Sequence, residues 1–164
     1  MATFISELFK LAKMMFDSKP KDFNELELCE TKHFPFKRYK YMCWCGRCVY
    51  RESTQGAGEL VGRDKNHETT HLRQAQDCKT WISYYLKYVW SWFIISPFFG
   101  KKGYYMNKYE TEAYAKEADD SYLGRRVYNA VDMFNQKNKS SIWKECSKSS
   151  YKYKIYITDK FKDC

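Results

Sequence analysis

The sequence contains the stretch Asn66-His67-Glu68-Thr69-Thr70-His71, which fits the pattern H-E-x-x-H. Two of the three histidines of the chain lie here, four residues apart. Residues i and i+4 of a helix lie one above the other, so His67 and His71 can bind one zinc ion together. Glu68 lies ~100° further round the helix. Its carboxylate can act as general base on the water that the metal activates, without binding the metal itself.

The residues around the motif favour a helix. Asp64 and Asn66 are both suitable N-cap residues, and we expect the helix to run through Gln76. The alternative is a surface helix whose histidines are merely polar, because so short a pattern also arises by chance. A second helix is expected from residue 108 to about residue 121, with Asn107 as its cap. It carries glutamates about forty residues after the motif, which can supply a third ligand.

Glu110 and Glu112 are the candidates for that third ligand. They point ~200° apart around a helix, so one of them at most can face the metal. Glu110 shares its face with Ala113. Glu112 shares its face with Lys108 and Lys116, which is typical of a solvated face. We therefore predict Glu110 as the third ligand and keep Glu112 as the runner-up.

Length, composition and net charge limit the classes of protein to which this chain can belong. The 164 residues fit one domain, and 44% hydrophobic with 19% aromatic residues argues against a disordered chain. The net charge of +9 suits an acidic partner: nucleic acid, an anionic membrane surface or an acidic protein. Lysine supplies most of this charge and no cluster of arginines alternates with aromatics, which argues against specific recognition of nucleic acid.

The cysteines indicate a reducing compartment. There are seven, an odd number, and the first residues lack the basic stretch and long apolar core of a secretory signal. We therefore expect free thiols and a cytoplasmic or other reducing location. Cys43, Cys45 and Cys48, with Cys29 or His33, are a weak candidate for a second zinc site. Small buried side chains in a strand are the favoured interpretation of this cluster.

The first half of the chain predicts one helix and a small sheet. Residues 3–16 have the spacing of an amphipathic helix, which we expect to dock on the domain, with a protein partner or a membrane surface as alternatives. Residues 21–32 are acidic and resemble a loop. Residues 39–51 predict one or two strands with a turn near Gly46, and a Gly-rich loop follows over 52–63.

The second half is predicted to be mainly helical. The aromatic stretch Trp81–Ile95, ended by Pro97 and Gly100, is expected to be a buried core helix. A helix that contacts the membrane interface is the alternative, since ~20 apolar residues span a bilayer and this stretch falls only a little short. Residues 101–106 predict a connection and residues 124–134 a further helix. Residues 151–157 alternate like a strand, within a Lys-rich tail.

Several segments, in order, carry a resemblance to a known family. They resemble a family of small uncharacterised zincin-like proteins of Bacteroidetes bacteria, of the gluzincin type of metallopeptidase, and a phage of such bacteria can carry a relative. The matching family segments read P-F-K-G, N-H-E-x-I-H-x-x-Q, F-E-x-E-A-Y and Y-L-x-x-R. The resemblance implies a zincin fold and a zinc site, with no established substrate. Gluzincins often have Asp where this chain has Tyr114. The segments, which span about residues 33–127, are His33-Phe34-Pro35-Phe36, Cys45-Gly46, Asn66 to Gln74, Tyr109 to Tyr114, and Tyr122-Leu123-x-x-Arg126.

Together these observations predict an α+β fold that is zincin-like and mostly helical. A small antiparallel sheet or hairpin is expected before the motif helix. We expect an N-terminal helix over residues 1–19, a zincin-like domain over 20–135 and a basic extension over 136–164.

Two functions fit this fold. The first is a zinc-dependent hydrolase, a peptidase acting on peptide or protein, with Glu68 as general base and Tyr114 or Tyr122 as donor to the oxyanion. The second is a structural or adaptor protein that keeps zinc as a staple and binds an assembly, for example a phage virion, through residues 1–19 and 136–164. A water at the fourth zinc position favours the hydrolase, and a fourth protein ligand favours the adaptor. The protein is then cytoplasmic, bound to a membrane surface or part of a virion.

Overall fold

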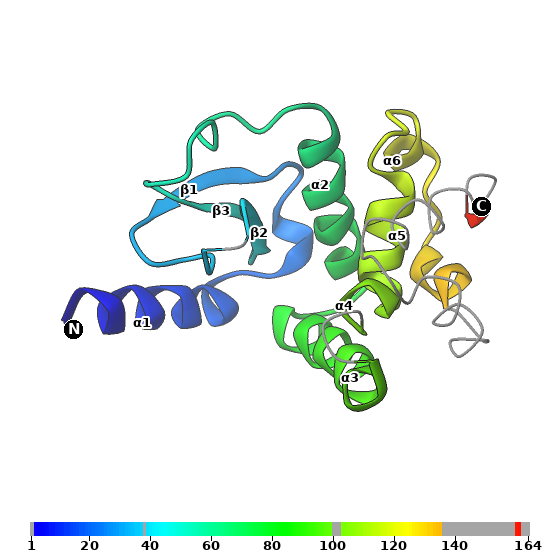
Figure 1. Cartoon of the computed structure of the whole chain (residues 1–164), viewed down its shortest axis with the longest axis horizontal. Helices are drawn as coiled ribbons and strands as arrows, with labels where there is room; N and C mark the ends of the chain where they lie inside the picture. Colours follow the sequence, from blue (N-terminus) through cyan, green and yellow to red (C-terminus); the bar gives the residue numbers. More distant parts are fainter. Residues whose placement is uncertain (1, 38, 100–102, 136–159, 162–164) are drawn as a thin grey trace.

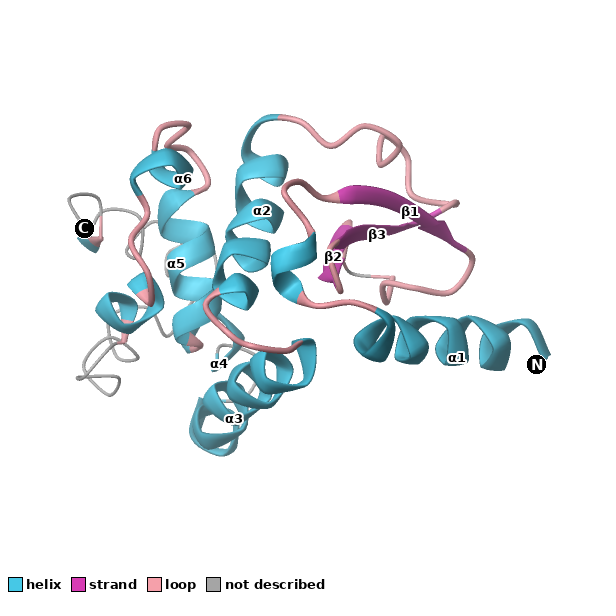
Figure 2. Ribbon diagram, turned by 180° about the vertical axis from the view of Figure 1, so that it is seen from behind, coloured by secondary structure: helices cyan, strands magenta, loops and turns pink. Residues whose placement is uncertain are grey.

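The computed structural model describes residues 2–37, 39–99, 103–135 and 160–161, with residues 2 and 94–99 described by their backbone. Figures 1 and 2 show an α+β fold from opposite sides, as predicted. The strands are β1 (Glu27–Thr31), β2 (Tyr41–Trp44) and β3 (Arg47–Arg51). The α-helices are α1 (Ala2–Asp17), α2 (Gly62–Gln76), α3 (Trp81–Phe99), α4 (Gly103–Met106), α5 (Lys108–Lys116) and α6 (Tyr122–Arg125). Short 3₁₀ helices are η1 (Pro20–Asp22) and η3 (Ala130–Phe134).

The predicted hairpin is present, with its turn at Gly46. β2 and β3 pair antiparallel, and Trp44 faces Arg47 across a two-residue loop. Both loop residues have positive φ, 48° at Cys45 and 77° at Gly46, which is the backbone of a type I′ turn. A Cβ at Gly46 would lie 2.3 Å from the ring of Phe23. Glycine is therefore required here by both backbone and packing.

The sheet is mixed, with strand order β1-β3-β2, so the predicted antiparallel hairpin is only part of it. β1 pairs parallel to β3 and lies within the segment that we expected to be a loop. The sequence did not predict β1 because it contains glutamates. Glu27 and Glu30 are exposed on this edge strand, in which only Thr31 is buried. An edge strand of this kind lacks the apolar alternation by which strands are recognised in sequence.

α2 lies between the sheet and α5 (Figures 1 and 2). It begins at Gly62 with Val61 as the N-cap, so the prediction of Asp64 or Asn66 as the cap is wrong. Both side chains have other partners. Asp64 forms an ion pair with Lys40 at 2.8 Å, and Asn66 donates hydrogen bonds to α5's C-terminal end and the turn after it.

α3 is less buried than expected for a core helix. It buries Trp81 and Tyr84 in the main core, beside Leu72 of α2 and Tyr109 of α5. Its opposite side exposes large apolar residues. The helix continues past Pro97 to Phe99. Among the described residues, no helix has the length and apolar character needed to cross a bilayer.

The last described elements differ in detail from the prediction. The connection over residues 101–106 contains α4, and α5 ends at Lys116 rather than near residue 121. The helix predicted over 124–134 is instead α6 and η3, separated at Asn129, which has a φ of 56°. The strand predicted over 151–157 lies outside the described residues.

α1 docks on the sheet side of the molecule through one narrow edge. Leu11 is buried against Phe34 and Val49, and its carbonyl accepts a hydrogen bond from Trp44 Nε1 at 2.8 Å. The Glu7 carboxylate accepts hydrogen bonds from the backbone N–H groups of Lys32 and His33. Docking is thus confirmed for this side, which also packs Met14 and Met15 against the core, while the opposite side of the helix faces solvent.

Replacing Glu7 by Ala should lower the free energy of unfolding by ~1 kcal/mol, because two backbone N–H groups lose a charged acceptor. Chemical denaturation of both proteins measures this. Burial raises the pKa of Glu7, but the bonds from Lys32 and His33 outweigh it and hold the pKa below its ordinary value of 4.5. The stabilisation is therefore complete above pH 4.5 and is lost as the pH falls through the lowered pKa. Glu25→Ala, at an exposed position, is the control and should change little; equal losses in both variants would contradict this role.

Candidate metal centre

The predicted ligands come from two neighbouring helices. α2 carries His67 and His71 one turn apart, and α5 carries Glu110 in its first turn. The three side chains are at most 12% exposed. Their ligand atoms all lie within 4.8 Å of one another. The structure therefore brings together the three residues that the sequence predicts, in a group that can hold a metal ion.

The distances suit a single ion. Glu110 Oε2 lies 3.7 Å from His67 Nε2, and Glu110 Oε1 lies 3.4 Å from His71 Nε2. Ligands ~2.1 Å from a tetrahedral zinc ion lie roughly 3.4 Å from one another. Two histidines and one glutamate are also a ligand set of catalytic zinc sites, where the fourth position stays open.

Both imidazoles are oriented by a partner at the other ring nitrogen. His71 Nδ1 lies 2.9 Å from Gln74 Oε1, which can only accept. His67 Nδ1 lies 3.4 Å from a carboxylate oxygen of Glu117. Each Nδ1 thus carries the proton and each Nε2 presents its lone pair to the shared space. The carboxylate that contacts His67 here is therefore that of Glu117.

The charges of the site also point to a cation. Glu68 Oε2 and Glu110 Oε2 are buried and have no hydrogen-bond partner. Tyr88 donates a hydrogen bond to the other oxygen of Glu110. A buried carboxylate oxygen without a partner is costly, and a metal ion beside it offsets that cost. The buried residues present therefore fit the group that the motif implies.

Glu68 lies in the same pocket as the three ligands but outside their group. Burial raises its pKa above the ordinary value, although the neighbouring His67 and His71 oppose the shift. A carboxylate with a raised pKa is a better proton acceptor near neutral pH. For His67, burial lowers the pKa, but the hydrogen bond to Glu117 and the charges of Glu110 and Glu68 outweigh it, so the net shift is upward.

The pocket has a volume of about 780 Å³ and is lined mainly by aromatic side chains from β2, α3, α4 and α5. Tyr114 is one of them, and its ring packs on that of His67 at 4.5 Å. Of the two tyrosines predicted to stabilise an oxyanion, Tyr114 therefore lies at the site. Tyr122 does not, because its hydroxyl donates to Glu112 at 2.9 Å, away from this pocket.

Glu112 is not on a solvated face, so that part of the prediction is wrong. It is fully buried, because α5 is enclosed by α2, α4 and η3. Arg126 forms an ion pair with it, and Gln74 Nε2 donates to its Oε2 at 3.0 Å. Glu112 is thus outside the group of ligand atoms but linked to it, since the same Gln74 orients His71. The sequence marked Gln74 and Arg126 only as positions of the family resemblance and did not single out Glu117, because the contacts of Arg126 with Glu112 and of Glu117 with His67 join separate parts of the chain.

The cysteine cluster forms no second metal site among the described residues. Cys43 and Cys48 face each other across the hairpin, while Cys45 lies in its turn. His33 is instead paired with Glu7 at 2.9 Å. Burial raises the pKa of Cys45 to about 12, so its thiol stays protonated, as for a packed side chain.

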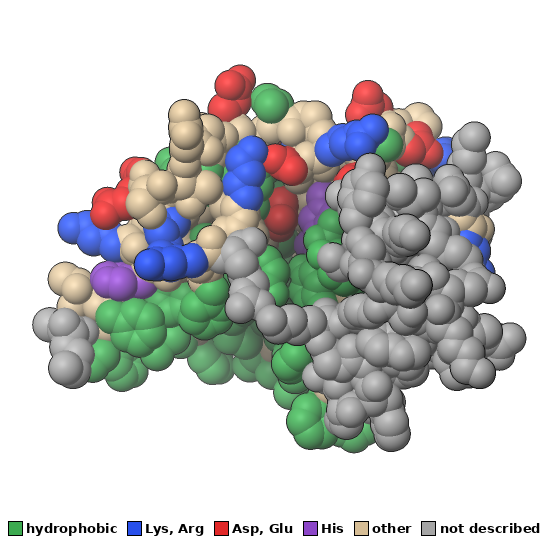
Figure 3. Space-filling view, in the orientation of Figure 1, with side chains coloured by type: hydrophobic (Ala, Val, Ile, Leu, Met, Phe, Trp, Pro, Cys, Tyr) green, Lys and Arg blue, Asp and Glu red, His purple; other side chains and the backbone are tan. Residues whose placement is uncertain are grey.

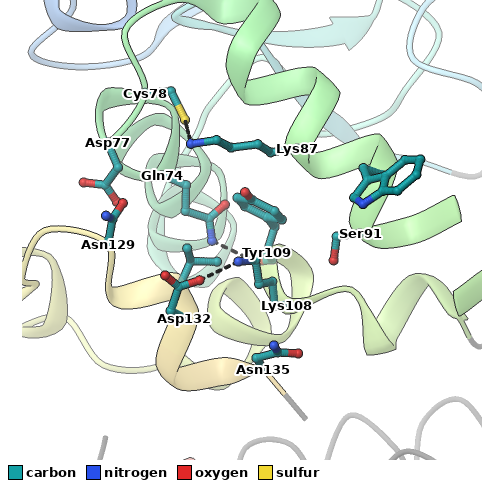
Figure 4. A pocket seen from close by; sticks show the side chains of 12 residues that line it. Gln74, Asp77, Cys78, Lys87, Ser91, Lys108, Tyr109, Asn129, Asp132 and Asn135 are labelled. Atoms are coloured by element: carbon teal, nitrogen blue, oxygen red, sulfur yellow. Dashed lines mark hydrogen bonds and ion pairs between the residues drawn. The ribbon is translucent and has the colours of Figure 1, made fainter. Parts of the chain in front are cut away.

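A separate pocket of about 520 Å³ lies between α3, α5 and η3 (Figure 4). Lys108 forms an ion pair with Asp132, Asp77 forms one with Arg126, and Lys87 donates a hydrogen bond to the thiol of Cys78. These contacts do not point to a ligand, so we assign the pocket no function.

No protein-family model, curated protein or solved structure matches the chain. The zincin fold and the resemblance to Bacteroidetes or phage proteins therefore stay predictions. The coarser statement stands on the structure itself: a buried group of two histidines and one glutamate that can hold a metal ion.

We expect one transition-metal ion per purified chain, which His71→Ala should lose, because two ligands cannot hold the ion tightly. Elemental analysis by mass spectrometry measures this and also identifies the metal. His33→Ala is the matched control, since it removes the one histidine outside the group and should keep the metal. Metal loss in both variants, or in neither, would contradict the assignment.

Glu117→Gln should weaken metal affinity roughly tenfold, because the partner of His67 Nδ1 loses its charge while its shape is kept. Competition with a chromophoric chelator measures the affinity. Glu59→Gln, at an exposed position, controls for the change of net charge. Equal affinities of the two variants would show that Glu117 does not orient His67.

Proposed function

We propose that the protein is a zinc-dependent hydrolase, and specifically a peptidase. The observation that carries this proposal is the placement of Glu68 in the same pocket as a three-ligand group. Three protein ligands and an adjacent base are the arrangement of a catalytic zinc site, whereas a structural site uses four protein ligands.

When bound, a zinc ion supplies Lewis acidity, which polarises a carbonyl and lowers the pKa of water to about 7. His67, His71 and Glu110 would hold the ion. Glu68 accepts the proton of the attacking water and passes it to the leaving amine, which its raised pKa favours. Tyr114, whose ring packs on that of His67, would donate the hydrogen bond to the oxyanion.

The sheet favours a peptide as substrate. β2 is an edge strand, and Tyr41, Met42, Cys43 and Trp44 all line the pocket. An extended peptide can add to such an edge through backbone hydrogen bonds, which places its carbonyls beside the ligand group. The aromatic lining suits apolar side chains at the scissile bond.

The second candidate is the adaptor with a structural metal. It requires a fourth protein ligand, and among the described residues the group consists of His67, His71 and Glu110 alone. The hydrolase is therefore the better supported function. An assembly bound through residues 1–19 and 136–164 stays a separate proposal, compatible with either.

Glu68→Gln should lower turnover by at least ~10²-fold while the metal stays bound, because the amide cannot accept the proton. Cleavage of a mixed library of synthetic peptides, followed by mass spectrometry, measures turnover and reveals preferred residues. Metal content of the same preparation is the control. Wild-type turnover in Glu68→Gln would exclude this residue as the base. An inactive wild type that carries one metal ion per chain would favour the adaptor.

A further inference from the structure

α1 turns its widest apolar face to solvent. Ile5, Leu8, Phe9 and Phe16 lie on one side of the helix and are 47–75% exposed. The side that docks on the protein is a different one, which carries Leu11 and is buried. Such a face is costly in water and marks a binding surface.

α3 has a second face of the same kind. Ile82, Leu86, Val89, Trp90 and Phe93 follow one another around one side of the helix and are 38–66% exposed. They lie opposite Tyr84 and Trp81, which fill the core. Helical spacing places them along one stripe without a charged residue.

The two faces belong to one side of the molecule. α1 contacts α3, and Figure 3 shows hydrophobic side chains gathered along the lower side, where Figure 1 places both helices. Phe4 of α1 stacks on Phe34 at 5.4 Å, and Phe34 packs on Phe36 at 5.9 Å. Phe36 is 66% exposed and lines the pocket of the metal centre. We call these faces of α1 and α3, with Phe36, the apolar surface.

Basic residues border the apolar surface. Lys10 and Lys13 lie on the polar side of α1, next to its apolar face, and are exposed. Lys32 and Lys37 are exposed on the adjoining segment, which α1 contacts through Glu7. A helix with apolar residues on one side and lysines on the other is the pattern of a helix that lies in a membrane interface. Tryptophan, present on α3, also favours this region of a bilayer.

We propose that the apolar surface binds an anionic lipid bilayer, with α1 and α3 lying in its interface. The net charge of +9 favours anionic lipid and disfavours a second copy of the same chain, which would bring equal charge to the contact. Phe36 and Val89 line the metal pocket as well, so the apolar surface adjoins that pocket. The proposal does not depend on the proposed hydrolase activity, because it uses none of the ligands.

The test is co-sedimentation of the full chain with vesicles of phosphatidylcholine alone or with about 30% phosphatidylserine. Wild type should bind the anionic vesicles more tightly, and less so as salt rises to about 0.5 M. Phe9→Glu/Phe16→Glu should weaken binding roughly tenfold or more, because two exposed apolar anchors become charged. Leu86→Glu/Phe93→Glu should act likewise from α3.

The matched control is Val127→Glu/Met133→Glu, which adds the same charge at exposed apolar residues outside the apolar surface and should bind like wild type. Circular dichroism shows that each variant is folded, and wild type stripped of metal should bind as before. No binding by wild type, or equal binding by the α1 variant and the control, overturns the proposal. Equal binding to both vesicle types overturns the preference for anionic lipid. A wild-type dimer that the α1 substitutions dissociate identifies a second copy as the occupant instead.

Discussion

The buried ion pair between Glu112 and Arg126 is the constraint on which the site depends. A carboxylate on the inner side of α5 is tolerated only because a guanidinium and two further donors, Tyr122 and Gln74, satisfy it. Arg126 also reaches Asp77 at the end of α2, at 2.8 Å. The pair therefore links α2 to α5 and positions the side chain of Gln74. The Oε1 atom of Gln74 in turn contacts His71 Nδ1 and orients the imidazole for a metal.

Around this pair the interior carries more polar groups than the core of a small domain needs for folding. His67, Glu68, Glu110 and Glu117 are nearly buried together, and two carboxylate oxygens have no hydrogen bond. Burial of such groups opposes folding unless a cation compensates it. The aromatic lining contributed by α3 and α4 lowers the local dielectric constant, which strengthens every charge interaction at the centre. Burial of these residues therefore strengthens the charge interactions of the site but opposes folding. A bound metal would offset the cost to folding.

Hydrophobic residues are divided between this interior and the outside. Trp81 and Tyr84 of α3 pack inward, whereas Leu86 and Trp90 of the same helix remain exposed. Val89, which is also exposed on α3, lines the pocket, so the candidate metal centre and the apolar surface share a border. A hydrolase arranged in this way would meet substrates at an interface rather than in bulk water.

The sequence by itself determined the local features. The H-E-x-x-H spacing predicted the helix and the common face of His67 and His71. Asn107 predicted the cap of α5, and Gly46 predicted the hairpin turn. Each of these depends on residues close in the chain, where helix periodicity and backbone sterics decide the outcome.

Only the tertiary structure decided the rest. β1 was not predicted, because an acidic segment becomes a strand only through its parallel pairing with β3. The burial of Glu112 was not predicted either, because its partner Arg126 comes from the C-terminal end of α6. Residues far apart in the sequence come together around Glu112. Gln74, Tyr122 and Arg126, which lie in segments that carry the family resemblance, all donate hydrogen bonds to its carboxylate. Which face of α1 and α3 is buried was likewise set by packing against other elements. A side chain's neighbours across the fold, and not its place in a local pattern, determine its burial, its charge and its role.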